Sequence, residues 1–364
     1  MAKRFTDLYP RIRSFENLWY AYRDAARGKH CTPGVARFEF HVEERLLELE
    51  AELAARTYRP GPYRSFYIRD PKRRLISAAP FRDRVVHHAL CWVIEPLFEA
   101  TFIADSYANR IGRGTHAALD RAEQFAGRYR YVLQCDVRQF FPSIDHAVLR
   151  EILARKLACP DTLGLCDAIL DGGAGVLDGE YTQAYFPGDD LFAAARPRGL
   201  PIGNLTSQFW ANCYLNELDQ FVKRTLRCGA YLRYVDDFLL FADDKPTLWA
   251  WKEALCERLA ALRLRVHQGS STVYPVAAGI PFLGFRLMPG VRRLKRRNGV
   301  LFARRLARVT RAWVRGEVVA GAIWDCYLGW EAHAAHGETT GLRAALLRGA
   351  ASAGRGATPS LPLR

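Results

Sequence analysis

Two adjacent aspartates, Asp236 and Asp237, interrupt an otherwise apolar and aromatic run, YLRYVDDFLLF at residues 231–241. Apolar residues continue on both sides of the pair, a pattern that predicts a β-hairpin with the two aspartates at its tip. Neighbouring like charges are costly in a buried segment unless a cation or a shifted pKa compensates for them. The run is therefore either an exposed hairpin turn, in which aspartate is common, or part of a site that binds something positive.

A third carboxylate, Asp136, follows the apolar residues of YVLQCD at 131–136. We expect the strand that contains it to end near Pro142 and a helix to start near Asp145. If this strand and the hairpin are neighbours in one sheet, the three carboxylates meet. Carboxylate oxygens are ligands that Mg²⁺ prefers, and two bound Mg²⁺ ions support an in-line phosphoryl transfer. The three aspartates are therefore candidate metal ligands.

The rest of the chain mixes helical and hairpin patterns. Apolar residues recur at helical spacing over 37–58, 81–102, 206–226 and 247–264. Strand-like segments flank an Asp-Pro turn at 70–71, which predicts a hairpin. Because strands and helices do not alternate regularly, we expect an α+β fold in which helices cover one side of the sheet.

Basic residues outnumber acidic residues by 53 to 38, and the excess is uneven. Eleven basic residues and no acidic residue lie between Arg286 and Arg315. In this segment Phe302, Leu306, Val309 and Trp313 recur at helical spacing, and the other side of the same helix would carry Arg304, Arg308, Arg311 and Arg315. Such a stripe favours a polyanionic partner, most often nucleic acid, over a merely solubilising surface.

Composition also bears on where the chain acts. No run of about 18 uncharged apolar residues occurs, so we expect no membrane span. The first residues, MAKRFTDLYPRIRSF, lack the apolar segment of a signal peptide. The nine cysteines form no Cys-x-x-Cys pair, which is typical of reduced thiols. We therefore expect a cytoplasmic protein.

The YVDD motif and the upstream segment DVRQFFPSID (136–145) resemble the active-site motifs of reverse transcriptases. Further segments resemble other conserved blocks of the bacterial members, in the same order: KRRLISAAPFRDRVVHHAL (72–90), SYANRIGRGTHAAL (106–119), GLPIGNLTSQFWANCYLNELD (199–219) and GIPFLGFRL (279–287). A lone YVDD is weak evidence, whereas several blocks in order are strong. The resemblance covers residues 59–287 and extends more faintly to YLGWEAHAAHG (327–337).

The resemblance implies an RNA-directed DNA polymerase with a right-hand fold, in which an antiparallel palm sheet with helices lies between fingers and a helical thumb. We expect an N-terminal helical extension at 1–58, fingers at 59–125, a palm at 126–290 with a connection around 171–210, a thumb at 291–345 and a disordered tail at 346–364. The implied substrates are deoxynucleoside triphosphates and an RNA template with a DNA or RNA primer.

The resemblance also implies roles for individual residues. Two Mg²⁺ ions, which Mn²⁺ could replace, would be bound by Asp136, Asp236, Asp237 and the backbone carbonyl of Val137. Phe141 would exclude a ribose 2′-hydroxyl. The alternative is that Phe140 and Phe141 are both core residues, but the period of two along a strand favours Phe140 alone.

Cations are implied at two further places. Lys72 and Arg74 match the residues that hold the incoming triphosphate, with a solubilising surface role as the alternative. Arg113 is expected to approach the template, and the template–primer duplex is expected to contact Arg304, Arg308, Arg311 and Arg315.

One block narrows the resemblance to a subfamily. In IGNLTSQ (202–208), Ile202 stands where most of the family has glutamine, and Gln208 stands where it has proline. This form resembles the reverse transcriptases of diversity-generating retroelements, which copy a template-repeat RNA with frequent errors opposite adenines. Such enzymes act with a small basic accessory variability protein, an oligomer.

The two residues are expected to lie at the nucleotide. Ile202 offers shape but no hydrogen bond there, which would lower discrimination; the alternative is that it is a packed side chain. Two other functions stay open: a retron, group II-like or abortive-infection reverse transcriptase, and a catalytically silent nucleic-acid-binding protein.

Overall fold

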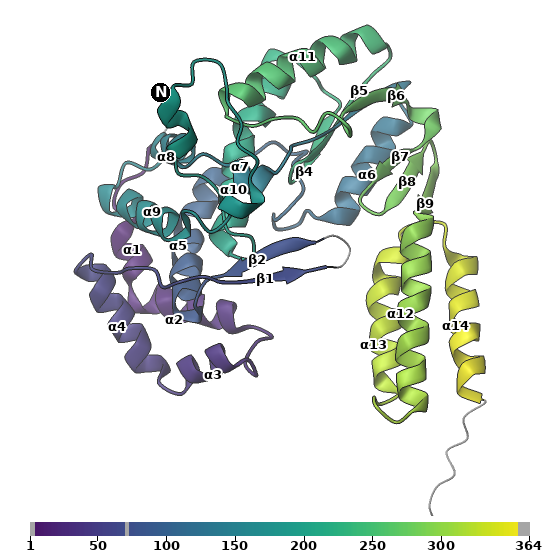
Figure 1. Cartoon of the computed structure of the whole chain (residues 1–364), viewed down its shortest axis with the longest axis horizontal. Helices are drawn as coiled ribbons and strands as arrows, with labels where there is room; N and C mark the ends of the chain where they lie inside the picture. The colour runs from purple at the N-terminus through teal and green to yellow at the C-terminus, as the bar shows by residue number, and fades with distance from the viewer. Residues whose placement is uncertain (1–3, 70–72, 356–364) are drawn as a thin grey trace, which may run out of the picture.

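The computed structural model describes residues 4–69 and 73–355 (Figure 1). Its N-terminal region consists of the helices α1 (Tyr9–Arg13), α2 (Phe15–Ala26), α3 (Pro33–Glu39) and α4 (Val42–Ala54). The single helix expected over 37–58 is wrong, because the helix is broken at Phe40 and His41. The two halves pack on different partners: Phe38 of α3 contacts the aromatic ring of Phe81, whereas α4 packs on α1 and α2.

An antiparallel hairpin follows, made of β1 (Arg64–Ile68) and β2 (Arg74–Ala78), and it leads into the long helix α5 (Phe81–Glu99). Both the hairpin and the helix confirm the patterns seen in the sequence. The Asp-Pro pair at 70–71 itself lies outside the described residues.

The central sheet has the strand order β4–β5–β3–β6, and its paired strands are antiparallel. Its strands are β3 (Tyr131–Asp136), β4 (Tyr231–Tyr234), β5 (Asp237–Ala242) and β6 (Thr272–Pro275). The strand that ends in Asp136 is therefore the direct neighbour of the strand that begins at Asp237. This is the adjacency on which the metal-site hypothesis depended.

Both faces of this sheet are buried. Leu133 and Phe238 pack into the same core as helices α10 (Leu205–Gln220) and α11 (Lys245–Ala261). The alternate residues Val132 and Leu239 pack instead against α6 (Thr115–Ala126) and a three-stranded sheet of β7 (Ile280–Phe282), β8 (Phe285–Met288) and β9 (Val291–Leu294). The expectation that helices cover one side only is wrong, because the strands carry apolar residues at odd and even positions alike.

The strand β3 ends at Asp136 rather than near Pro142. Gln139 adopts a left-handed backbone (φ 47°), which stops an extended chain and starts the short helix α7 (Phe140–Ser143). The helix expected from Asp145 is confirmed as α8 (His146–Ala154), and the Asp145 side chain accepts a hydrogen bond from the Val148 N–H at 3.1 Å.

The remaining elements connect the sheet. They are α9 (Pro160–Gly173), the 3₁₀ turns Asp178–Glu180, Leu191–Ala195 and Val276–Ala278, and a π-helical turn Phe221–Thr225 that extends α10. The helices α10 and α11 confirm the helical patterns at 206–226 and 247–264. All nine cysteines lie in the described part of the chain and are free.

Three helices, α12 (Arg296–Val314), α13 (Gly321–Ala334) and α14 (Thr340–Arg355), follow β9 and lie side by side (Figure 1). Because α14 runs to Arg355, the helical region continues past the boundary expected at residue 345, and 346–355 are helical rather than disordered. Residues 356–364 lie outside the described residues. None of the helices described is long and apolar enough to cross a membrane.

Candidate active site

The three aspartates lie at one end of the central sheet. Asp136, the last residue of β3, is paired with Asp237, the first residue of β5. Tyr234 of β4 is also paired with Asp237, so the hairpin turn consists of Val235 and Asp236. The predicted hairpin is confirmed, but its tip lies one residue earlier than expected, and only Asp236 of the two aspartates is in the turn.

The surroundings of Asp236 are electrostatically unusual. Burial and then the negative charge of Asp136 raise its pKa to about 6, against smaller lowering effects of Arg74 and Arg233. A carboxyl whose pKa is raised by another carboxyl lies where positive charge is in deficit. Two carboxylates on adjacent strands and a third, perturbed in this way, in the adjoining turn fit a hard divalent cation by their chemistry.

As the side chains stand, no group of three or more His, Cys, Asp and Glu side chains among the described residues is arranged to hold a metal ion. The fit to a cation therefore rests on the presence of three carboxylates and on the repulsion between them, and not on side chains that already surround a metal position. Val137, whose carbonyl was expected as a ligand, is buried, and its N–H donates to the carbonyl of Asp236 at 3.3 Å.

The two phenylalanines after Asp136 differ in burial. Phe140 is 2% exposed and packs in the core, which confirms the choice of Phe140 as the core residue, while Phe141 is only partly buried. Their rings are 5.4 Å apart between centroids. Both belong to helix α7 rather than to a strand, so strand periodicity was the wrong reason for the right assignment.

The loop that contains Ile202 is attached to β2. The Ser77 N–H donates to the Ile202 carbonyl at 2.8 Å. The Asn204 side chain donates to the Ser77 carbonyl at 2.9 Å and accepts from the Ala79 N–H at 3.1 Å. Ile202 is partly buried, and Gln208, in the first turns of α10, is exposed.

The strand β2 brings this loop together with Arg74. Arg74 is exposed, and its charge has a small lowering effect on the pKa of Asp236. Lys72, the other expected ligand, lies outside the described residues.

Arg113 lies on an exposed loop between two glycines with left-handed backbone, Gly112 (φ 71°) and Gly114 (φ 109°). The loop is joined to the central sheet, because the Gly114 N–H donates to the Tyr107 carbonyl at 2.9 Å and the Tyr107 N–H donates to the Arg233 carbonyl at 3.0 Å. Arg113 is thus connected through the backbone to the strand that leads to Asp236.

The arginine stripe predicted on α12 is present in part. Arg304, Arg308 and Arg311 are exposed on the helix, whose buried residues include Phe302 and Leu306. Val309 and Trp313 are only partly buried, and Thr310 takes their place in the packed face. Arg315 follows the helix end and forms an ion pair with Glu317 at 2.6 Å, so part of its charge is neutralised.

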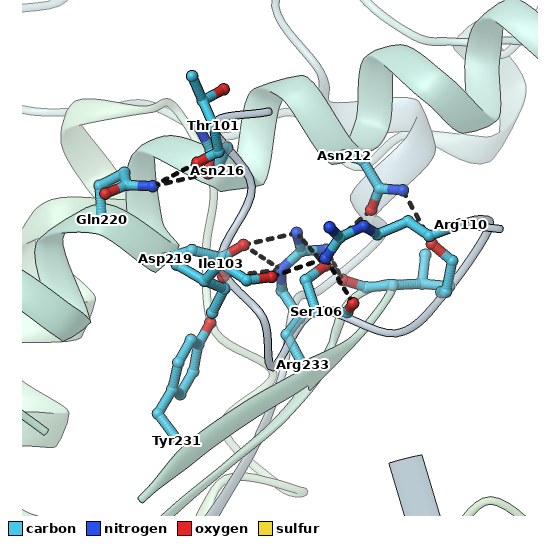
Figure 2. Close-up of polar contacts among 12 residues, drawn as sticks. Thr101, Ile103, Ser106, Arg110, Asn212, Asn216, Asp219, Gln220, Tyr231 and Arg233 are labelled. Carbon is cyan, nitrogen blue, oxygen red and sulfur yellow. Dashed lines mark hydrogen bonds and ion pairs between the residues drawn. The ribbon is translucent and has the colours of Figure 1, made fainter. Parts of the chain in front are cut away.

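Sequence reasoning missed a buried polar network next to the turn (Figure 2). Arg233 of β4 and Asp219 of α10 are both 0% exposed and form an ion pair at 2.7 Å. Asn212 of α10 and Ser106 also bind the Arg233 guanidinium. The signal was present, because strand alternation places Arg233 on the same face as Tyr231, where a charge requires a partner.

Comparisons with known proteins show the family of the chain. The family described as reverse transcriptase (RNA-dependent DNA polymerase) matches residues 69–287. Protein YkfC of Escherichia coli K12 is 27% identical over 312 residues, which cover 72% of this chain and 77% of that protein. The group II intron-encoded protein LtrA of Lactococcus lactis is 28% identical over 225 residues, 60% of this chain but only 35% of LtrA. A telomerase structure from Candida albicans aligns with 65% of this chain at 12% identity and a TM-score of 0.44.

Proposed function

The chain belongs to the reverse transcriptase family of RNA-dependent DNA polymerases, and from this premise we propose that Asp136, Asp236 and Asp237 form its nucleotidyl-transfer site. The observation that carries the proposal is the pairing of Asp136 with Asp237 next to the turn that holds Asp236. The fold is the α+β right-hand polymerase of that family. The expected domain boundaries become proposals within it, with the thumb extended to Arg355.

The three carboxylates, with the Val137 carbonyl, would hold two Mg²⁺ ions, or Mn²⁺ in their place. Two such ions lower the pKa of an attacking hydroxyl and stabilise the leaving diphosphate. The chain's own contribution would be to hold two of the carboxylates on adjacent strands and the third in the adjoining turn, so that only side-chain movement is needed to close them around the ions.

The deoxynucleoside triphosphate is proposed to bind between the sheet end and the β1–β2 hairpin. Arg74 supports this placement, since its charge already acts on Asp236. Lys72 and Arg74 would contact the phosphates, and Phe141, partly exposed two residues after the left-handed Gln139, would exclude a ribose 2′-hydroxyl. Ile202 and Gln208 would border the base pair.

The RNA template and the primer are proposed to contact Arg113 on its exposed loop and the exposed arginines of α12. The arginines of α12 belong to the segment from Arg286 to Arg315, which contains eleven basic residues and no acidic residue. Arg113 lies outside this segment. Arg315 contributes less in this proposal, because Glu317 is its ion-pair partner.

The central experiment is primer extension on an RNA template with deoxynucleotides and Mg²⁺, with Asp236→Ala as the variant. Activity should be lost while the thermal unfolding temperature is kept, because the turn is at the sheet end and the carboxylate is a ligand rather than a core group. Polymerisation by Asp236→Ala at the wild-type rate would refute the site and the metal proposal together. A wild type that never extends a primer would favour the catalytically silent binding protein.

At the finer level, we propose that the enzyme is of the diversity-generating retroelement type and copies a template-repeat RNA with errors opposite adenines. The IGNLTSQ loop supports this proposal. The Ser77 N–H of β2 binds the Ile202 carbonyl, which holds the loop on the strand, and the Ile202 side chain has no polar group that could bind a nucleotide. The accessory variability protein is part of this proposal. Sequencing of cDNA made in vitro tests it: errors should concentrate opposite template adenine.

A second candidate is a group II-like reverse transcriptase with ordinary fidelity. The similarity to the group II intron-encoded protein LtrA favours it. The two candidates differ in error spectrum, and also in genomic context, since a nearby pair of repeats that differ mainly at adenines is expected only for the mutagenic type.

A further inference from the structure

A fully buried ion pair joins Arg233, on the strand that leads into the proposed site, to Asp219 of α10. Figure 2 shows the two side chains and their polar partners. Arg233 of β4 donates from Nε to Asp219 Oδ1 at 2.8 Å and from Nη2 to Asp219 Oδ2 at 2.7 Å. Tyr231, two residues earlier on the same strand, donates its hydroxyl to Asp219 Oδ1 at 2.6 Å. The Tyr231 hydroxyl therefore helps to hold the Asp219 carboxylate in place, and the two bonds from Arg233 to this carboxylate fix the orientation of the guanidinium plane.

The other side of the guanidinium is equally engaged. Nη1 donates to the Val235 carbonyl at 2.9 Å and to Asn212 Oδ1 at 3.2 Å, and Nη2 donates to Ser106 Oγ at 3.0 Å. With the two bonds to Asp219, these contacts use every N–H group that a guanidinium has. Arg233 thus joins helix α10, the loop at Ser106 and the turn that carries Asp236.

The turn needs such a support. Val235 has φ 56°, in the left-handed region, where a β-branched residue is a genuine outlier and persists only if its surroundings impose it. Its carbonyl is held by Arg233, and the next carbonyl, that of Asp236, accepts the Val137 N–H at 3.3 Å. These bonds fix the peptide groups on both sides of the Asp236 Cα atom.

We infer that Arg233 is a positioning residue for catalysis: oriented by Asp219, it holds the strained Val235–Asp236 turn and so places the Asp236 carboxylate toward Asp136. The inference rests on the proposed function, in which Asp236 binds the metal. A buried ion pair is weak evidence for added stability, since apolar replacements of similar volume are often as stable. An apolar pair of the same volume could not donate the hydrogen bond by which Arg233 holds the Val235 carbonyl of the turn.

Two variants separate position from stability. Arg233→Lys keeps the charge but cannot bind Asp219, Asn212, Ser106 and Val235 together. The double variant Arg233→Met/Asp219→Leu replaces the pair by apolar side chains and tests the site without a buried unpaired charge. The matched control is Arg196→Met, which removes another two-bond Arg–Asp pair, that with Asp145 (2.6 and 2.9 Å), from a different part of the fold.

The readouts are thermal unfolding, the Mg²⁺ concentration for half-maximal primer extension, and Mn²⁺ binding to the free protein by electron paramagnetic resonance. Both Arg233 variants should need a Mg²⁺ concentration raised by about 10- to 100-fold, the range for groups that orient metal ligands, and should bind Mn²⁺ correspondingly weakly. The control should shift the unfolding temperature without shifting the Mg²⁺ response.

A folded Arg233 variant with the wild-type Mg²⁺ response and Mn²⁺ affinity overturns the positioning role. If Asp236→Ala is inactive in the same series, that result leaves the proposed site intact. If Asp236→Ala is fully active, the site assignment fails first and the positioning role fails with it.

Discussion

Asp136 and Asp237 lie directly opposite each other in the antiparallel pairing of β3 and β5. Residues in this relation point to the same face of the sheet, with Cβ atoms about 5 Å apart, and like charges so placed destabilise the pair. Asp236, in the adjoining turn, adds a third carboxylate, and its pKa is raised first by burial and then by the negative charge of Asp136. We expect this arrangement to lower stability in the free protein and to become favourable if cations bind as proposed.

Asp136→Asn should reduce RNA-templated DNA synthesis by about a hundredfold or more, because the loss of a metal ligand should reduce activity at least as much as the loss of a group that orients the ligands. The isosteric amide removes one charge from a repulsive cluster, so the unfolding temperature should not fall. Primer extension and thermal unfolding measure the two effects.

The matched control for this prediction is Asp243→Asn, near the opposite end of the same hairpin, where Asp243 is exposed and accepts the Arg130 N–H at 3.3 Å. It should retain activity. Equal losses in the two variants would point to damage of the sheet instead of the loss of a ligand.

Ile202→Gln should lower misincorporation opposite template adenine. A glutamine side chain at this position can donate and accept hydrogen bonds at the nucleotide, which increases the free-energy difference between right and wrong pairs. Deep sequencing of cDNA from one defined template measures the error spectrum. Ile202→Val, which keeps the shape and adds no polar group, is the control and should keep the wild-type spectrum. An unchanged spectrum in Ile202→Gln would remove the physical basis of the fidelity proposal.

Charge reversal of Arg308 and Arg311 together should weaken template–primer binding and flatten its dependence on salt. Each lost phosphate contact lowers the slope of log K against log salt by about 0.9 on a duplex, so the double variant should lower it by roughly 2. Fluorescence anisotropy at several salt concentrations gives the slope.

Arg315→Glu provides the comparison for the α12 stripe, because this arginine already binds Glu317 at 2.6 Å. Its effect on the slope should be smaller than that of either exposed arginine. Salt slopes that are the same for wild type and for the double variant would exclude α12 as the binding surface.

His87→Leu should make the protein more resistant to acid. His87 is buried in α5, and in the described structure neither of its ring nitrogens has a hydrogen-bond partner. Burial, and to a lesser degree His88 and Arg84, lower its pKa to about 3. Below the unfolded-state pKa of about 6.5 the unfolded chain binds a proton that the folded chain does not. Stability is therefore lost as the pH falls from 6.5 towards 3.

The loss amounts to about 1.4 kcal/mol per pH unit, so at pH 5 the variant should exceed the wild type by about 2 kcal/mol more than it does at pH 7.5. Urea unfolding at the two pH values measures this difference. His41→Leu, at an exposed position, should show no such pH-dependent gain. If the free energy of unfolding changed with pH by the same amount in His87→Leu as in the wild type, His87 would have to bind its proton in the folded state as well.

Much of the local structure could be predicted from the sequence, and the errors have a common cause. The hairpin around Asp236, the helix after Asp145 and the helical patterns of α5, α10 and α11 follow from short-range periodicity and capping, which act over a few residues. The break at Phe40–His41 and the early end of β3 at Asp136 do not, because they depend on which partners each segment packs against and on one left-handed residue, Gln139.

The sequence by itself predicted a strand that leads to Asp136 and a hairpin around Asp236 and Asp237, one residue out of place at its tip, and its ordered motifs indicated the family. Tertiary structure decided that β3 and β5 are neighbours in the register that pairs Asp136 with Asp237, residues about a hundred positions apart in the chain. It also decided that Arg233 meets Asp219, Asn212 and Ser106. The physical reason is that a buried charge requires a partner but does not specify which one; the packing of α10 against the sheet makes that choice.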